Sequence, residues 1–147
     1  MFNRILVVCV GNICRSPTAE YLLRARLGVS KCEVSSAGLS AMAGQVIDPT
    51  AGELLRENGV DGRRHHARQV TGEMLRQSDL ILTMERAHSA AIARDYPEVS
   101  GKVFLLGKWQ SDIDIPDPYR QPRYAFVHAY RLIDKCVDGW LPYLRKQ

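Results

Sequence analysis

The sequence predicts a single α/β domain over residues 1–147, with a four-stranded parallel sheet and helices on both faces. Short apolar runs alternate along the chain with segments that begin and end at helix-capping residues. The 147 residues fit one ordinary domain, because no internal repeat or low-complexity tract divides them. A composition that is 46% hydrophobic is enough to form its core.

The first half of the chain contains two predicted strands and two predicted helices. A β-branched, apolar run that ends before Gly11 is typical of a buried parallel strand. Each helix opens with a capping residue followed by proline, Ser16–Pro17 in the first and Asp48–Pro49 in the second. In chain order the elements are strand 4–9, helix 17–27, strand 33–36 and a helix from 49 to about 58.

The second half repeats this alternation. Thr71 is a typical N-cap and predicts a short helix. A buried apolar strand follows at 80–84, then a helix from 86 that ends before Pro97, then a strand at 102–106. The last segment, about 122–144, has apolar residues at helical spacing. These are Phe126, Tyr130, Ile133, Val137 and Leu141.

Charge and cysteine content exclude several classes of protein. A formal net charge of +4 is a mild bias towards anionic partners, and no basic stripe or zinc-finger pattern indicates nucleic acid. The four cysteines lack CxxC spacing and no export signal precedes them, so we expect reduced thiols in a cytoplasmic protein. The longest apolar run is too short to insert into a membrane. No HExxH pattern occurs, and we expect neither a metal nor another cofactor.

The loop after the first strand is the predicted functional site, because parallel α/β sheets bind ligands at the carboxyl ends of their strands. It reads Cys-Val-Gly-Asn-Ile-Cys-Arg-Ser over residues 9–16. The next helix offers unpaired N–H groups and the positive end of its dipole, which stabilise a bound phosphate and the thiolate of Cys9. The planar fork of Arg15 can hold two phosphoryl oxygens. The octet predicts a phosphate-binding loop with a cysteine nucleophile, although Cys9 alone also fits a buried strand-end thiol.

Four stretches of the chain together resemble one family. They are VCVGNICRSPTAE at 8–20, Ser-Ser-Ala-Gly at 35–38, His65 with Ala-Arg-Gln at 67–69, and Asp-Pro-Tyr at 117–119. Over essentially its whole length the chain closely resembles the low-molecular-weight protein tyrosine phosphatases. It is most similar to the bacterial branch that serves exopolysaccharide and capsule export, whose members dephosphorylate a membrane-bound tyrosine autokinase. The resemblance implies a phosphotyrosine protein, such an autokinase, as the partner.

The resemblance also implies the catalytic residues. The cysteine matching Cys9 forms a phosphocysteine intermediate, the arginine matching Arg15 binds the phosphoryl oxygens, and the aspartate matching Asp117 is the general acid. Residues matching Asn12, Ser36 and His65 hold the loop in a strained shape, and the serine matching Ser16 stabilises the thiolate. We expect substrate to be bound by Val10, Gly11, Asn12, Ile13, Cys14, Ser16 and Tyr119, the last by stacking on the aryl ring.

Some of these residues have a second interpretation in the sequence itself. Asn12 is also an ordinary turn residue. His65 competes with His66, and we prefer His65 because it has the family's spacing. Asp-Pro occurs twice, but Asp48 precedes a helical pattern and predicts an N-cap, whereas Asp117 lies in a proline-stiffened loop with no helix directly after it.

The expected pocket walls differ from those of eukaryotic members of the family. Those members have an aromatic residue in the segment matching about 39–45, where this chain has Leu39 and Met42. They also have a second tyrosine where this chain has Arg120. An arginine there favours acidic flanks around the phosphotyrosine or is simply solvated. These differences affect substrate preference and leave the chemistry unchanged.

Two other functions fit the same fold. An arsenate reductase needs resolving cysteines in the segment matching 74–93, and this chain has none there. A phosphotyrosine-binding adaptor would lack the nucleophile or the acid, and both are present. A further hypothesis concerns redox control: Cys14 either resolves oxidised Cys9 as a disulfide or only fills space at the base of the loop.

Overall fold

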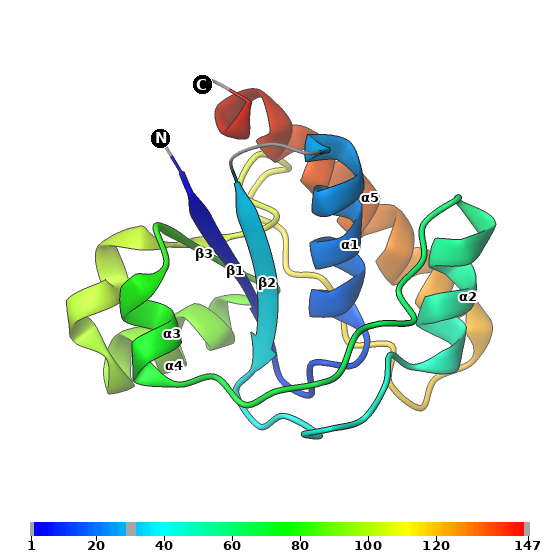
Figure 1. The fold of residues 1–147 in the computed structure, drawn as a ribbon, viewed down its shortest axis with the longest axis horizontal. Coiled ribbons are helices and arrows are strands. Elements are labelled where there is room, and N and C mark those ends of the chain that lie inside the picture. Colours follow the sequence, from blue (N-terminus) through cyan, green and yellow to red (C-terminus); the bar gives the residue numbers. More distant parts are fainter. Residues whose placement is uncertain (1, 29–31, 146–147) are drawn as a thin grey trace.

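The computed structural model describes residues 2–28 and 32–145, and its centre is a four-stranded sheet in which every pairing is parallel. The strand order is β2-β1-β3-β4. The predicted parallel sheet is therefore confirmed, and β1 lies between β2 and β3 (Figure 1). The bounds are β1 Arg4–Cys9, β2 Glu33–Gly38, β3 Leu80–Thr83 and β4 Val103–Leu105.

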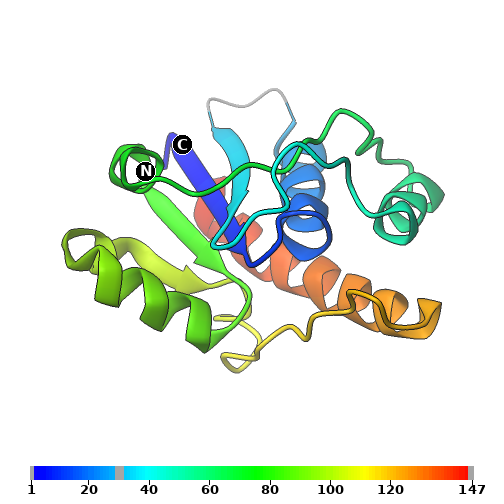
Figure 2. The same cartoon turned by 90° about the horizontal axis from the view of Figure 1, so that it is seen from below.

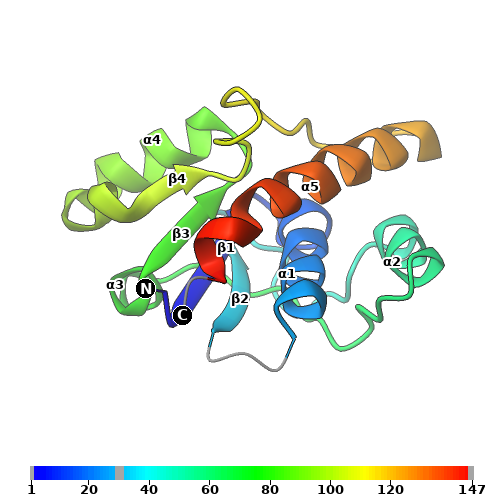
Figure 3. The same cartoon turned by 90° about the horizontal axis from the view of Figure 1, so that it is seen from above.

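Helices cover both faces of this sheet, as predicted (Figure 3). Helices α1 and α5 pack against each other on one face, α3 and α4 lie on the other, and α2 packs on α1 and α5. No described helix is long and apolar enough to cross a membrane. The bounds are α1 Arg15–Leu27, α2 Pro49–Glu57, α3 Gly72–Gln77, α4 Arg86–Asp95, the 3-10 helix η1 Pro97–Lys102 and α5 Arg123–Leu144.

Alternation along β1 divides the core into two clusters, because successive side chains of a strand point to opposite faces. Ile5 and Val7 pack into the larger cluster, with α1 and α5. Leu6 and Val8 pack into the smaller one, with residues from α3 and α4. All four side chains are buried, so β1 is fixed from both sides and the position of the loop that follows it is fixed too.

Side chains and backbone occupy the outer edge of β2. Arg24 Nε donates to the carbonyl of Val34 at 3.1 Å, and Arg68 Nε donates to the carbonyl of Ser36 at 3.0 Å. At the end of the strand, Gly38 exchanges backbone hydrogen bonds with the segment that contains Arg68. On the far side of the sheet, the indole of Trp140 donates to the carbonyl at residue 106, just beyond β4.

The structure corrects one predicted cap. Helix α1 begins at Arg15 with Cys14 at the N-cap position and no side-chain cap, so Ser16 is not the N-cap. The Ser16 hydroxyl instead contacts the sulfur of Cys9, because the helix begins inside the loop itself. Asp48 and Thr71 do cap α2 and α3, as predicted.

Smaller differences concern the strand ends. Strand β2 continues to Gly38, two residues beyond the predicted end, where a Cβ would lie 2.4 Å from the carbonyl oxygen of Val10. Glycine is therefore required where the loop passes β2. Strands β3 and β4 are shorter than predicted, and the sequence did not predict η1.

Candidate active site

The loop between β1 and α1 forms the floor of a cavity of about 160 Å³. Figure 2 views the molecule from the side where β1 and β2 end, and the loop curls at this edge. The cavity brings together the predicted loop residues with Asp117 and Tyr119, which lie more than a hundred positions away in the chain. Its lining residues are Cys9, Val10, Gly11, Asn12, Ile13, Cys14, Arg15, Ser40, Met42, Asp117 and Tyr119.

Cys9 lies at the base of this cavity, with 3% of its surface exposed. Its sulfur is 2.9 Å from the hydroxyl oxygen of Ser16. That oxygen accepts a hydrogen bond from Asn12 Nδ2 at 2.8 Å, which leaves the serine proton free to point at the sulfur. Together with the uncapped start of α1, this hydroxyl places hydrogen-bond donors around the sulfur at the base of the cavity.

Asn12 holds the loop in a backbone conformation that residues other than glycine rarely adopt. Its φ is 60°, in the left-handed region, and it is fully buried. The amide nitrogen donates to the hydroxyls of Ser16 and Ser36, the latter at 3.0 Å. The amide oxygen accepts from the backbone N–H of Arg68 at 2.9 Å. Every polar group of this side chain is used, so Asn12 joins the loop to β2 and to the segment that follows His65.

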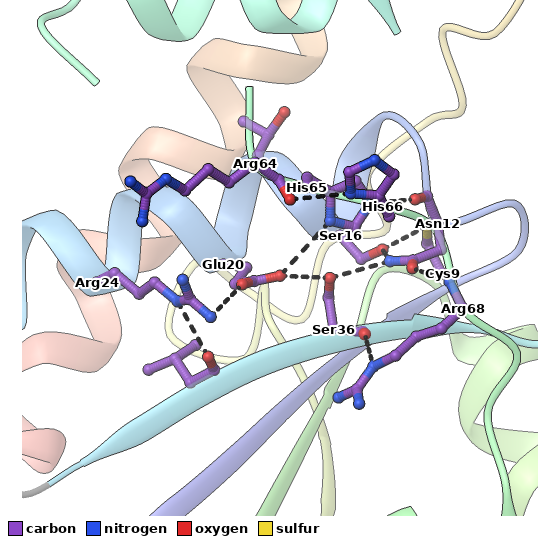
Figure 4. Close-up of polar contacts among 12 residues, drawn as sticks. Cys9, Asn12, Ser16, Glu20, Arg24, Ser36, Arg64, His65, His66 and Arg68 are labelled. Carbon is purple, nitrogen blue, oxygen red and sulfur yellow. Dashed lines mark hydrogen bonds and ion pairs between the residues drawn. The ribbon is translucent and has the colours of Figure 1, made fainter. Parts of the chain in front are cut away.

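Glu20, which the sequence analysis did not single out, supports the same network (Figure 4). The hydroxyl of Ser36 donates to Glu20 Oε1 at 2.6 Å, and Arg24 pairs with the other carboxylate oxygen at 2.8 Å. Glu20 is 4% exposed although it is charged. Its signal in the sequence is an acidic residue on the helix face that also carries Ala19 and Leu23, which are buried.

The two neighbouring histidines have different positions. His65 is buried, and its Nε2 donates to the carbonyl oxygen of Asn12 at 2.6 Å. Its Nδ1 lies 3.9 Å from Glu20. Burial lowers the pKa of His65, which keeps the ring neutral at neutral pH. His66 is exposed, and its Nδ1 contacts the carbonyl oxygen of Arg64, outside the loop.

Arg15 lies in the wall of the cavity, with 2% of its surface exposed. Its NH1 donates to Glu85 and, at 2.7 Å, to the carbonyl oxygen of Ile115. Its NH2 is 3.8 Å from Asp117 Oδ2. Because NH1 is fixed by two acceptors, the Nε and NH2 edge is the one that can bind two oxygens of an anion in the cavity. Glu85 is a second residue that the sequence analysis did not identify.

Asp117 and Tyr119 complete the lining of the cavity next to Arg15. Asp117 is about half exposed, with a side-chain exposure of 47%, and its Oδ1 accepts from the backbone N–H of Tyr119 at 3.0 Å. The guanidinium of Arg120 lies over the ring of Tyr119, 5.3 Å from its centroid. Asp48 is engaged elsewhere, since it accepts from the backbone of Thr50 at the start of α2.

The remaining wall is mostly apolar. Met42 faces the loop, where its side chain lies 3.7 Å from the place a Cβ on Gly11 would occupy. Val10 is 39% exposed at the rim. Leu39 does not line the cavity but packs against the smaller core cluster. A cavity with anion-binding groups at its base and apolar walls suits a flat ligand that ends in a phosphate.

The cysteines are all free thiols among the residues described, and no group of three or more metal-ligating side chains occurs there. Cys14 is a buried residue of the loop, and burial raises the pKa of its thiol well above the usual range. Cys14 is therefore a protonated thiol at neutral pH.

Comparison with known proteins gives one consistent result. Residues 4–147 match the family described as low molecular weight phosphotyrosine protein phosphatase. The low molecular weight protein-tyrosine-phosphatase Wzb of Salmonella typhimurium is 49% identical over 140 residues, which is 95% of this chain and 93% of that protein. Two solved structures are similarly close. Vibrio vulnificus Wzb in complex with benzylphosphonate is 46% identical with a TM-score of 0.93, covering 97% of this chain and 99% of that one. The Erwinia amylovora tyrosine phosphatase AmsI is 44% identical with a TM-score of 0.94, covering 99% and 95%.

Proposed function

The chain belongs to the low molecular weight phosphotyrosine protein phosphatase family, and we propose that it hydrolyses phosphotyrosine in two steps through a phosphocysteine on Cys9. It is a protein-tyrosine phosphatase like its relatives. The observation that carries the two-step proposal is the sulfur of Cys9 at the base of a cavity that Arg15 and the uncapped start of α1 also line.

In the first step the thiolate of Cys9 attacks phosphorus, and the bond from phosphorus to the phenolic oxygen breaks. Arg15 and the loop N–H groups stabilise the charge on the three outer oxygens. Asp117 donates its proton to the leaving oxygen, because a tyrosine phenolate, with a conjugate acid pKa of about 10, is a poor leaving group.

In the second step water attacks the phosphocysteine. Asp117, now a carboxylate, accepts a proton from that water, the sulfur–phosphorus bond breaks, and inorganic phosphate and the Cys9 thiolate are released. Asp117 is half exposed beside Arg15, a position from which it can reach both the substrate and solvent. Neither step requires a metal ion.

We assign a supporting role to the network behind the loop. Asn12, Ser36 and His65 keep the left-handed turn closed, and Glu20 holds the proton of Ser36 so that the Ser36 oxygen accepts from Asn12. Ser16 completes the chain of hydrogen bonds to the sulfur of Cys9. Loss of any one of these side chains should distort the loop at 9–16 before it affects the fold.

The substrate is a phosphotyrosine protein, and we propose that Tyr119 stacks on its ring. The cysteine at the cavity base is reached by a long aryl phosphate rather than by a short alkyl one. The benzylphosphonate bound to the Vibrio vulnificus relative is a ligand of this shape. From the resemblance to the exopolysaccharide branch, we propose a membrane tyrosine autokinase as the partner and the cytoplasm as the location.

The test is hydrolysis of p-nitrophenyl phosphate and of a phosphopeptide panel. Activity should survive EDTA and disappear in Cys9→Ser, and Arg15→Lys should be severely impaired because a point charge does not replace a planar fork. Phosphotyrosine peptides should be preferred over phosphoserine peptides. Full activity of Cys9→Ser would contradict the phosphocysteine, and arsenate turnover with thioredoxin would favour a reductase instead.

A further inference from the structure

His88 is a buried histidine that the proposed chemistry does not use. It lies in the first turn of α4 and is 4% exposed. Its Nδ1 is buried, and within the described part of the chain it has no hydrogen-bond partner. A buried polar atom without a partner costs stability, and an apolar side chain would fill the same space without that cost. A functional reason for a histidine at this position must therefore involve its other ring nitrogen, Nε2.

That nitrogen, Nε2, points at Glu85, with 3.6 Å to Oε2. This contact is longer than a hydrogen bond, but such contacts are often long in ligand-free enzymes and shorten when ligand binds. Because a carboxylate only accepts, a hydrogen bond between the neutral ring and Glu85 requires the proton on Nε2 and the lone pair on Nδ1. The same oxygen of Glu85 is the one that accepts from Arg15 NH1.

Glu85 occupies the N-cap position of α4 without capping it, since its side chain makes no cap hydrogen bond. Asp114 supplies a side-chain acceptor there instead and accepts from the backbone N–H of Arg86 at 2.9 Å. The carboxylate of Glu85 is thus free to turn to Arg15. His88 and Arg15 are the two side chains that contact it in the described residues.

The protonation state of His88 fits this arrangement. Burial lowers the pKa of its ring, and the positive charge of Arg15 lowers it further. The carboxylates of Glu85, Asp114 and Asp117 act in the opposite direction but do not outweigh burial. The ring is neutral at neutral pH and can offer Glu85 an N–H without competing with Arg15 as a second cation.

We propose that His88 is a positioning residue for Arg15: its Nε2–H orients the carboxylate of Glu85, which fixes NH1 so that the other edge of the guanidinium meets the phosphoryl group. This inference rests on the proposed role of Arg15 in binding phosphate. His88 thus acts through Glu85, without contacting the substrate.

The test uses two amides that place their nitrogen differently. In His88→Gln the amide nitrogen reaches the place of Nε2 and can still donate to Glu85. In His88→Asn the amide nitrogen lies nearer the place of Nδ1, so no donor faces Glu85. We expect kcat/KM on p-nitrophenyl phosphate to fall about three- to tenfold in His88→Asn, as for loss of one hydrogen bond of ordinary net strength. His88→Gln should stay within about twofold of wild type.

Binding of inorganic phosphate, measured by calorimetry, separates this role from the catalytic proposal because it needs no turnover. Its dissociation constant should rise about three- to tenfold in His88→Asn and little in His88→Gln. Thermal unfolding of both variants reports the purely structural contribution. If both variants lower the midpoint of thermal unfolding equally and leave phosphate binding unchanged, His88 only fills the core and the proposal is wrong.

A second background tests whether the effect passes through Glu85. In Glu85→Gln, adding His88→Asn should cause no further loss of phosphate affinity, because residues that act in series are not additive. An equal loss in both backgrounds would overturn the proposal. If wild type binds phosphate as expected but Cys9→Ser retains activity, the proposed catalytic mechanism fails while the positioning of Arg15 stands.

Discussion

Replacing Asn12 by glycine distinguishes a loop-supporting residue from an ordinary turn residue. Glycine adopts a φ of 60° without steric cost, so Asn12→Gly keeps the turn and removes only the amide. The amide makes three hydrogen bonds, buried ones with Ser16 and Ser36 and a half-buried one with the backbone of Arg68. At about 0.5–1.5 kcal/mol each, their loss lowers the free energy of unfolding by about 1.5–4.5 kcal/mol. Relief of the left-handed strain, about 1–2 kcal/mol, offsets part of that loss in Asn12→Gly.

Asn12→Ala removes the same bonds but keeps a Cβ in the left-handed residue, so it should be about 1–2 kcal/mol less stable than Asn12→Gly, which relieves that strain. Urea unfolding should therefore rank wild type above Asn12→Gly, and Asn12→Gly above Asn12→Ala. Because Ser16 loses its donor, the sulfur of Cys9 loses its oriented partner, and kcat/KM on p-nitrophenyl phosphate should fall about 10²-fold in both variants.

Ser111 supplies the matched control, since its φ is also 60° but it is exposed and makes no side-chain hydrogen bond among those found in residues 2–28 and 32–145. Ser111→Gly relieves the same left-handed strain without losing such a bond, so it should not lower the free energy of unfolding and should leave kcat/KM unchanged. If Asn12→Gly behaves like Ser111→Gly in both measurements, Asn12 is only a turn residue and the supporting network is misassigned.

Three further predictions concern the acid, the thiols and a buried base. Asp117→Ala should lose about 10²- to 10⁴-fold in kcat on phosphotyrosine, with a smaller loss on substrates whose phenol is already acidic. Asp48→Ala should keep its activity and lose about 1 kcal/mol of stability, and the reverse result would mean that the other Asp-Pro pair supplies the acid. Peroxide should inactivate the enzyme through a disulfide between Cys9 and Cys14, and dithiothreitol should restore wild type; equal recovery of Cys14→Ser would exclude this pairing. The pKa of His65 is lowered by burial from its ordinary 6.5, so the neutral ring stabilises the fold fully above that pH and the free energy of unfolding should fall as the pH drops below it. Urea unfolding of His65→Gln should show a shallower decline, and an unchanged slope would assign the pH dependence to other groups.

Features with a local signal were predicted well from the sequence. The bounds of β1 agree residue for residue, because a buried parallel strand is an uninterrupted apolar run. The caps of α2 and α3 agree because capping depends on a side chain and the backbone two or three residues away. Ser16 was assigned wrongly for the same reason, since a serine before proline looks like a cap wherever its hydroxyl points.

Residues that act across the fold were not predicted. Glu85 lies 70 positions from Arg15, and Glu20 lies 16 positions from Ser36. Glu85 in its turn looks like a solvated charge, and the place of Glu20 on an apolar helix face indicates burial without naming a partner. Only the folded structure shows the partners of these two carboxylates. Asp117 entered through its family resemblance, because a turn-forming aspartate gives no local sign of what it faces.

The occupied edge of β2 bears on how copies of this protein behave at high concentration. An open edge strand offers unpaired carbonyls to which a strand of another molecule can add. Here the side chains of Arg24 and Arg68 already bind the outward carbonyls of Val34 and Ser36. The backbone of the segment at 68–70 pairs with Gly38. Arg68 also donates its backbone N–H to Asn12. One residue thus both blocks edge-to-edge aggregation and supports the catalytic loop, so a change that removes Arg68 in the search for altered activity should also lower the solubility of the protein.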